Sequence, residues 1–238
     1  MASSEILQDI DLVIFDVDGV IFDIIDAIKQ TVENGIEKYK LQSNLQEAMQ
    51  QVSHLLENVQ SMPIPKMILE SKELFDIPLF GDMTVLRKLR IAASFYGDFR
   101  AKKEECGIFP GIDKVIKGLH DKGKKLSILS NNKKSYVIEA LGKHGLQDYF
   151  NHILGFNEVK NTKPDPEGLI KILEKENVVS DKTLFIGDMV TDIHAGKAAG
   201  IKTIAVASGL VERPKLEQEN PYKIVKDIQE LQALFNVN

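Results

Sequence analysis

The segment Asp11-Leu12-Val13-Ile14-Phe15-Asp16-Val17-Asp18-Gly19 decides the fold of this chain. A run of apolar, partly β-branched residues that ends abruptly in acidic residues and a glycine is typical of a buried strand followed by a loop. The wider apolar stretch from Ile10 to Ile25 is too short to span a bilayer and is interrupted by aspartates. We therefore predict a buried first strand with acidic side chains at its carboxyl end.

After residue 109 the chain alternates short apolar runs with segments of helical periodicity. Strands are predicted at residues 125–129, 152–154, 183–186 and 203–206, and helices at 112–122, 134–143, 166–176, 193–199 and 226–235. Strands that alternate with helices pair in parallel through right-handed crossovers. The predicted fold class is therefore α/β, with a doubly wound, Rossmann-like parallel sheet covered by helices on both faces.

Residues 23–104 follow a different pattern. Apolar residues recur there at helical spacing, as in the stripe Ile24, Ile28, Val32 and Ile36. Prolines divide the block into separate helices at Pro63, Pro65 and Pro78. Because the first strand belongs with the later ones, we predict a Rossmann-like core of residues 1–22 and 105–238 and an all-helical domain of residues 23–104 inserted into it.

The composition limits the class of protein. A chain of 238 residues and 26.7 kDa, 43% hydrophobic and 27% charged, is typical of a globular protein with one core and room for an inserted domain. Cys106 is the single cysteine, which excludes an intramolecular disulfide and favours a reducing, cytoplasmic location. The net charge of −5 argues against nucleic acid or an anionic membrane as partner, so we expect a small-molecule partner. Monomer and homodimer both remain open.

Polar residues directly follow the predicted strands. They are Asp16, Asp18 and Gly19 after the first strand, Ser130-Asn131-Asn132 after the second, Lys163 in the next polar loop, and Asp188 and Asp192 after the fourth. Ligands of parallel sheets bind beyond the carboxyl ends of the strands. We therefore expect these residues to converge on one edge of the sheet.

These segments, in this order, resemble the motifs of haloacid-dehalogenase-superfamily hydrolases that carry a helical cap after the first strand. The likeness covers residues 10–22 and 105–238, including Phe109-Pro110-Gly111 and Ser208-Gly209. The inserted block is similar to such a cap only in length, placement and helicity. The resemblance implies phosphate chemistry at the edge of the sheet.

Two aspartates after the first strand suit phosphoryl transfer. The Asp16 carboxylate can attack phosphorus in line and form an aspartyl phosphate, which replaces one hard displacement with two easier ones. The Asp18 side chain would protonate the leaving alkoxide and later deprotonate water, and the resemblance implies that its backbone carbonyl binds a metal. Gly19 lets the backbone turn close to the phosphate. Taken alone, each aspartate could equally be a turn or capping carboxylate.

A phosphate dianion among these carboxylates requires a cation. Each close pair of unit charges repels by roughly 4 kcal/mol at an effective dielectric constant near 20. Oxygen ligands without cysteine favour Mg²⁺, held by Asp16, Asp188 and the Asp18 carbonyl. Asp192 is similar to the second acidic position of this motif and would brace the site or bind metal through water. It is also the predicted N-cap of a helix that begins at Ile193.

The remaining polar residues suit a phosphate ligand. Lys163 is similar to the family's lysine that neutralises the nucleophile and the phosphate together, although a surface lysine is the alternative. The Ser130 hydroxyl and the backbone N–H of Asn131 would donate to phosphate oxygens near a helix N-terminus. An ordinary turn also explains the Ser-Asn-Asn sequence.

The motifs favour hydrolysis over the other reactions of the superfamily. Dehalogenases do not need Asp18, phosphonatases replace it, and the pair Gly187-Asp188 is more similar to phosphoglycolate phosphatases and pyrophosphatases than to mutases. We predict a Mg²⁺-dependent phosphatase that hydrolyses a small phosphomonoester and is phosphoglycolate phosphatase-like. A pyrophosphatase and a phosphotransferase or sugar-phosphate mutase are the alternatives, the last because Val20 is common in mutases.

The inserted domain is expected to select the substrate, because the core motifs contact only phosphate and metal. Its basic side chains are candidates for holding an anionic substrate: Arg87, Lys88, Arg90 and Arg100. Exposure on an amphipathic helix explains each of them equally well.

Overall fold

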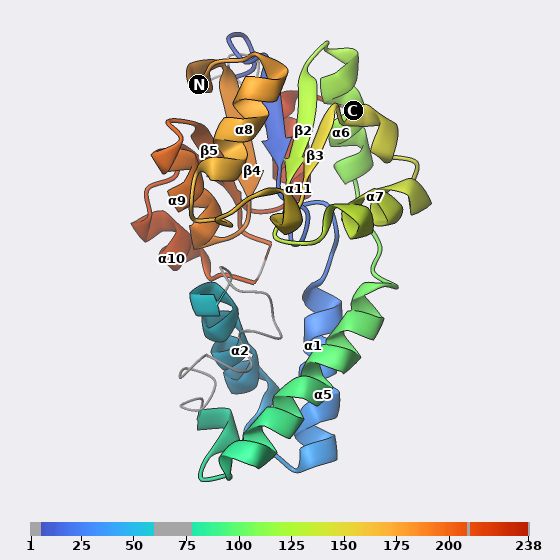
Figure 1. The fold of residues 1–238 in the computed structure, drawn as a ribbon, viewed down its shortest axis with the longest axis vertical. Coiled ribbons are helices and arrows are strands. Elements are labelled where there is room, and N and C mark those ends of the chain that lie inside the picture. The colour runs from blue at the N-terminus through green and yellow to red at the C-terminus, as the bar shows by residue number, and fades with distance from the viewer. Residues whose placement is uncertain (1–5, 60–77, 209, 238) are drawn as a thin grey trace. The chain divides into compact units, whose positions relative to one another are not determined.

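The computed structural model describes residues 6–59, 78–208 and 210–237, with side chains omitted for residues 53–59. It divides into two compact units, one of Met1–Asp23 with Gly107–Asn238 and one of Ile24–Cys106. Both ends of the chain belong to the first unit, and a single continuous segment forms the second (Figure 1). Of the residues used in the sequence analysis, Pro63, Pro65 and Gly209 lie outside the described part.

A parallel, six-stranded sheet forms the centre of the first unit (Figure 1). Its strands are β1 (Leu12–Phe15), β2 (Lys125–Leu129), β3 (His152–Leu154), β4 (Thr183–Gly187), β5 (Lys202–Val206) and β6 (Lys223–Val225). They lie in the order β3-β2-β1-β4-β5-β6, so the first strand of the chain is central. Burial on both faces explains why β1 reads as a continuous apolar run. The predicted α/β fold class is confirmed.

Helices cover the sheet. They are α6 (Ile112–Asp121), α7 (Lys134–Lys143), α8 (Glu167–Glu176), α9 (Val190–Ala198), α10 (Arg213–Gln218) and α11 (Ile228–Phe235). The strand order reverses direction between β3 and β4, and right-handed crossovers therefore place the helices on opposite faces. On one face, α8 and α9 share an apolar cluster with the sheet: Leu12, Ile14, Leu129, Leu154, Leu169, Ile172, Phe185, Ala195 and Ile201.

All secondary-structure elements in the described part of the second unit are helices. They are α1 (Ile25–Tyr39), α2 (Leu45–Val59), the short 3₁₀ helix η1 (Pro78–Phe80) and α5 (Val85–Lys103). Helices α1 and α5 pack closely because Gly35 leaves room for the ring of Phe95, which also lies 6.3 Å from the Tyr39 ring. Lys38 of α1 adds an ion pair with Asp98 of α5 at 3.7 Å.

Three features of the core unit differ from the sequence prediction. Strand β6, of three residues with a single buried one, and helix α10, of six residues, are absent from the prediction. Neither gives a clear periodic or apolar pattern. Helix α9 begins at Val190 instead of residue 193, which changes the position of Asp192 within it.

In the part of the chain that the structure describes, no helix is both long enough and apolar enough to cross a membrane.

Candidate active site

The central strands end level with one another. Phe15 of β1 is paired with Ile128 of β2 and Ile186 of β4. The Asp16 N–H continues the ladder by donating to the Ile186 carbonyl at 2.8 Å. The polar residues that follow these strands therefore emerge at the same carboxyl edge of the sheet.

Lys163 lies between two carboxylates at this edge. Its Nζ is 2.9 Å from Asp16 Oδ1 and 2.6 Å from Asp192 Oδ1. The lysine side chain is only 3% exposed, and it also lies over the Phe185 ring. A buried ammonium is tolerated only when it is paired, so these two contacts explain how a lysine persists in the interior.

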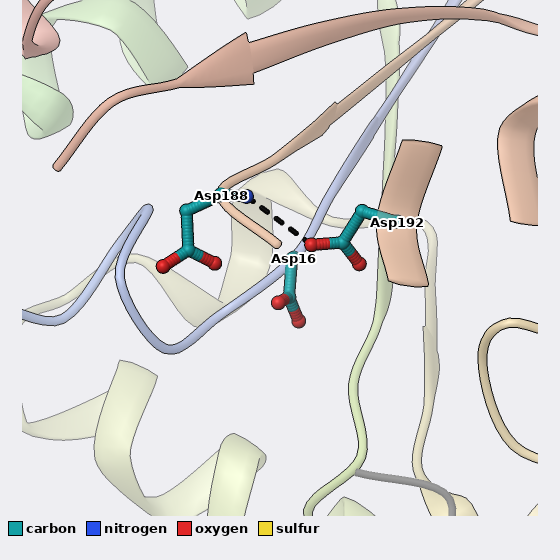
Figure 2. Close-up of side chains that lie close together, drawn as sticks. All are labelled: Asp16, Asp188 and Asp192. Carbon is teal, nitrogen blue, oxygen red and sulfur yellow. Dashed lines mark hydrogen bonds between the residues drawn. The ribbon is translucent and has the colours of Figure 1, made fainter. Parts of the chain in front are cut away.

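Asp192 is the third residue of α9 and not its N-cap. The helix begins at Val190, and the prediction of a helix that begins at Ile193 with Asp192 as its cap is therefore wrong. Its Oδ2 accepts the backbone N–H groups of Asp188 at 3.1 Å and Met189 at 3.0 Å (Figure 2 draws the first of these). The carboxylate thus satisfies the start of the helix from inside the first turn. Since Oδ1 binds the lysine, both oxygens are engaged.

Asp188 has an oxygen that the protein does not satisfy. Ser208 Oγ donates to Asp188 Oδ2 at 3.3 Å, whereas the buried Oδ1 has no hydrogen-bond partner among the described residues. Gly19 lies against this carboxylate with a φ of +77°, and a Cβ there would overlap it. Glycine is needed at position 19 for both the backbone angle and the close approach.

Three carboxylates gather at the site. One oxygen each of Asp16, Asp188 and Asp192 lies within 4.8 Å of the others, and all three residues are buried (Figure 2). Among the described residues, the Lys163 ammonium is the one cation that the structure shows in contact with this cluster. The excess negative charge, the unsatisfied Asp188 oxygen and the all-oxygen donor set fit a hard divalent cation.

The protonation of the cluster reflects its burial. Desolvation raises the pKa of Asp16 from 3.8 to about 7, although Lys163 opposes the rise. Desolvation and the neighbouring charge of Asp16 raise the pKa of Asp188 well above its ordinary value. Burial lowers the pKa of Lys163, but the charges of Asp16 and Asp192 outweigh it and the net pKa is raised. The cluster therefore holds extra protons unless another positive charge is present.

A second polar network joins the loops after β1 and β2. Asn132 Nδ2 donates to Asp18 Oδ2 at 2.9 Å and to Ser130 Oγ at 3.2 Å, and its backbone N–H donates to the same hydroxyl at 3.1 Å. Ser130 is buried, and Asn131 beside it is half-buried. The structure thus connects Asp18 and Ser130 through Asn132, which the sequence analysis expected at this edge without assigning it a role.

The loop that carries Lys163 is anchored by Glu167. The Glu167 carboxylate accepts the backbone N–H groups of Lys160 at 3.0 Å and Asn161 at 2.9 Å, and it pairs with Lys171 at 2.6 Å. Hydrogen bonds from Lys171 and from this backbone lower the pKa of Glu167 to about 2. The anchor therefore stays ionised over the whole neutral and mildly acidic range.

The sequence analysis placed Asn132 at this edge and included Ser208 in the resemblance without giving either residue a role, and it missed Glu167. Asn132 and Ser208 carry a usable signal, because each follows a strand at the same edge as the predicted residues. Glu167 carries a weaker one, since a glutamate in the first turn of a helix is common for electrostatic reasons alone.

The predicted substrate-binding residues of the inserted domain lie on α5. Arg87, Arg90 and Arg100 are exposed, and Arg100 Nε lies 3.8 Å from Glu104 Oε1 at the C-cap of the helix. Lys88 is buried. Exposed cations on a helix remain available to an anionic ligand, but nothing in their geometry distinguishes them from ordinary surface residues.

Comparison with known proteins supplies a family. A model of the family described as haloacid dehalogenase-like hydrolase matches residues 13–206. The chain is 29% identical to a phosphoglycolate phosphatase of Escherichia coli K12 over 156 residues, which are 66% of this chain and 60% of the relative. It is 27% identical to a phosphoglycolate phosphatase of Pseudomonas fluorescens over 150 residues, which are 63% of this chain and 54% of that relative. The matched part thus spans little more than half the length of these relatives.

A solved structure agrees with the fold. A protein described as a predicted phosphoglycolate phosphatase from Haemophilus somnus superposes with a TM-score of 0.73 at 16% sequence identity. The superposition covers 94% of this chain and 97% of that one. At this level of identity the likeness concerns the fold alone.

Proposed function

Because the chain belongs to the family of haloacid dehalogenase-like hydrolases, we propose that it hydrolyses a small phosphomonoester through an aspartyl phosphate on Asp16. One observation carries the proposal. The Asp16 carboxylate lies at the end of the central strand, 2.9 Å from the Lys163 ammonium and beside the buried, incompletely satisfied Asp188. Packing alone gives no reason to bury three carboxylates together, whereas phosphoryl transfer does.

The proposed reaction proceeds in two displacements. In the first, an Asp16 oxygen forms a bond to phosphorus in line as the bond to the alcohol oxygen breaks, and the Asp18 carboxyl group donates a proton to that oxygen. In the second, Asp18 takes a proton from water as the water oxygen attacks the phosphorus. The bond between phosphorus and Asp16 then breaks, and inorganic phosphate leaves.

Three groups are proposed to hold the phosphate. The Lys163 ammonium offsets the charge of Asp16 and of the phosphate, and its two carboxylate contacts keep it in place. Ser130 Oγ and the backbone N–H of Asn131 donate to phosphate oxygens near the start of α7. Gly19 leaves the space in which the Asp188 carboxylate and the phosphate lie close to the backbone.

Asp16, Asp188 and the backbone carbonyl of Asp18 are the proposed ligands of a Mg²⁺ ion. When bound, this ion would neutralise phosphate charge that the carboxylates otherwise repel. Asp192 was predicted to brace the site or to bind metal through water. We assign it the bracing role, because its two oxygens are already occupied by Lys163 and by two backbone N–H groups.

The proposed substrate is a small phosphorylated acid of the phosphoglycolate type. The names of the relatives from Escherichia coli and Pseudomonas fluorescens support this class. The single cysteine supports a reducing, cytoplasmic location, and a monomer or a homodimer suits the reaction equally.

The test is phosphate release from a panel of small phosphomonoesters, pyrophosphate and an aryl phosphate, with Mg²⁺ or with EDTA, beside Asp16→Asn. We expect release that requires Mg²⁺, is lost in Asp16→Asn and is fastest with a small phosphorylated acid. Release from pyrophosphate alone would replace the proposed substrate class with a pyrophosphatase. No phosphate release from any compound of the panel, despite measurable Mg²⁺ binding, would contradict hydrolysis and favour a phosphotransferase. Transfer of the phosphoryl group to an added sugar acceptor would then identify that activity.

A further inference from the structure

Asn132 contacts two residues with different proposed duties. Asp18 follows β1 and is the proposed acid and base, whereas Ser130 follows β2 and is a proposed phosphate donor. The Asn132 amide nitrogen lies 2.9 Å from Asp18 Oδ2 and 3.2 Å from Ser130 Oγ. One amide group therefore bridges the leaving-group side and the phosphate side of the site.

The chemistry of the partners fixes the direction of these hydrogen bonds. The amide nitrogen of Asn132, and not its oxygen, faces Asp18 Oδ2, which suits the ionised form of Asp18 because a carboxylate oxygen only accepts. Ser130 Oγ accepts from this nitrogen and also from the Asn132 backbone N–H at 3.1 Å. A hydroxyl has two lone pairs and one hydrogen. With both lone pairs directed at Asn132, the hydrogen is the part of the Ser130 hydroxyl that remains for a ligand.

We propose that Asn132 is a positioning residue that holds the Asp18 carboxylate and sets the Ser130 hydroxyl as a donor toward the phosphate. The inference rests on the proposed function. It adds that the proton-transfer group and the phosphate donor are coupled through one side chain. Loss of this side chain removes one hydrogen bond to the Asp18 carboxylate and one of the two hydrogen bonds that Ser130 Oγ accepts, while the backbone N–H of residue 132 still donates to the hydroxyl. One lone pair of the Ser130 hydroxyl then becomes available to accept from a ligand.

The experiment uses two substitutions at this position and a matched control. Asn132→Ala removes the bridge, and Asn132→Asp keeps its shape but replaces the donor with a carboxylate oxygen that repels Asp18. Asn157→Ala is the control, because Asn157 Oδ1 accepts the backbone N–H of Lys134 at 3.1 Å and so supports the start of α7, the helix that follows Asn132. This control removes an asparagine side chain near α7 without changing a residue of the proposed machinery.

The readout compares an alkyl phosphate, whose leaving group needs a proton, with an aryl phosphate, whose leaving group does not. We expect Asn132→Ala to lower kcat for the alkyl ester about 10–100-fold, as is typical when a supporting hydrogen bond to a catalytic group is lost, and to lower the aryl rate less. The decrease in kcat for the alkyl ester should be at least as large in Asn132→Asp. A purely structural defect would lower both rates equally.

A double substitution tests the coupling to Ser130. If Asn132 acts partly through the serine hydroxyl, the loss in Ser130→Ala/Asn132→Ala will be smaller than the product of the two single losses. Equal alkyl and aryl losses in Asn132→Ala, or rates that match Asn157→Ala, would overturn the inference while wild-type activity and its loss in Asp16→Asn left the proposed function intact. An inactive wild type would contradict the proposed function instead.

Discussion

Two buried acidic groups in the core unit differ in how their oxygens are satisfied. Glu176, at the end of α8, accepts from Ser127 Oγ at 2.6 Å through one oxygen and from Asn151 Nδ2 at 3.2 Å through the other, with Lys125 Nζ at 3.7 Å. Asp188, at the carboxyl edge of the sheet, leaves one buried oxygen without a hydrogen bond among the described residues. Both carboxylates are almost completely buried.

The difference separates structural burial from functional burial. A buried carboxylate with complete partners costs the fold little and ties its neighbours together. A buried carboxylate with an open oxygen and like charges beside it lowers stability, and it persists only where a ligand repays that cost. Burial of an acidic residue is therefore not evidence of a site until its oxygens have been accounted for.

The largest expected effect follows substitution of Asp188. In Asp188→Asn we expect kcat/KM with Mg²⁺ to fall at least about a thousand-fold, which corresponds to ~4 kcal/mol of lost transition-state stabilisation. The melting temperature without divalent cation should stay the same or rise, because the substitution replaces a carboxyl group whose ionisation is opposed by burial and by Asp16 with a neutral group of the same shape. Kinetics and thermal melting in EDTA measure the two effects. A large fall in melting temperature would show instead that Asp188 is structural, as Glu176 is.

Substitution of Glu176 should lower stability and leave turnover unchanged, the reverse of the result expected for Asp188. Glu176→Ala leaves the buried Ser127 hydroxyl and the Asn151 amide without their acceptors, and we expect a loss of about 2–3 kcal/mol in the free energy of unfolding. The turnover per folded molecule should not change, since none of these contacts involves the carboxyl edge of the sheet. Urea unfolding measures the free energy of unfolding, and activity assays normalised by active-site titration measure the turnover per folded molecule. Loss of turnover at unchanged stability would break the comparison.

The pH dependence of stability sharpens the contrast further. Because the folded-state pKa of Asp16 is raised from 3.8 to about 7, its neutral form is the one that the fold prefers. The stability present below pH 3.8 is therefore lost progressively as the pH rises to about 7. In EDTA, the melting temperature of Asp16→Asn should rise relative to that of wild type as the pH increases across this window. Mg²⁺ should reduce this difference in melting temperature by stabilising the ionised wild-type site. A constant gap across the window would contradict the prediction.

The sequence was sufficient to predict the sheet and the edge where the site lies. A short, partly β-branched apolar run ending in Asp16 is typical of a strand buried on both faces, and regular alternation after residue 109 implies parallel pairing. Once pairing is parallel, the polar residues after the strands must meet at one edge. Asp16, Lys163, Asp188 and Asp192 were therefore accessible to this reasoning without coordinates.

The sequence was not sufficient to predict how each oxygen is used. Asp192 has the residue type and the position of either a helix cap or a metal ligand, and only the start of α9 at Val190 shows that its oxygens are taken. The same limit applies to Glu176, whose partners Ser127 and Asn151 lie 49 and 25 residues away in the chain. Such pairings depend on strand register, which no local pattern encodes.

The smallest expected effect concerns Glu167, a half-buried carboxylate whose oxygens accept two backbone N–H groups and contact Lys171. In Glu167→Gln one of its oxygens becomes a donor, so the loop that carries Lys163 loses part of its backbone anchor. We expect kcat/KM to fall about three-fold with little change in melting temperature, because Glu167 lies near the surface and Gln keeps its shape and one acceptor oxygen. Glu174→Gln, on the exposed side of the same helix, is the matched control. Because the pKa of Glu167 is about 2, it stays ionised throughout the window in which Asp16 titrates, and the substitution should lower the rate equally at every pH in that window. A shift of the pH profile would mean that Glu167 reaches the buried cluster electrostatically, and the distinction between satisfied and unsatisfied acids would then fail at this position.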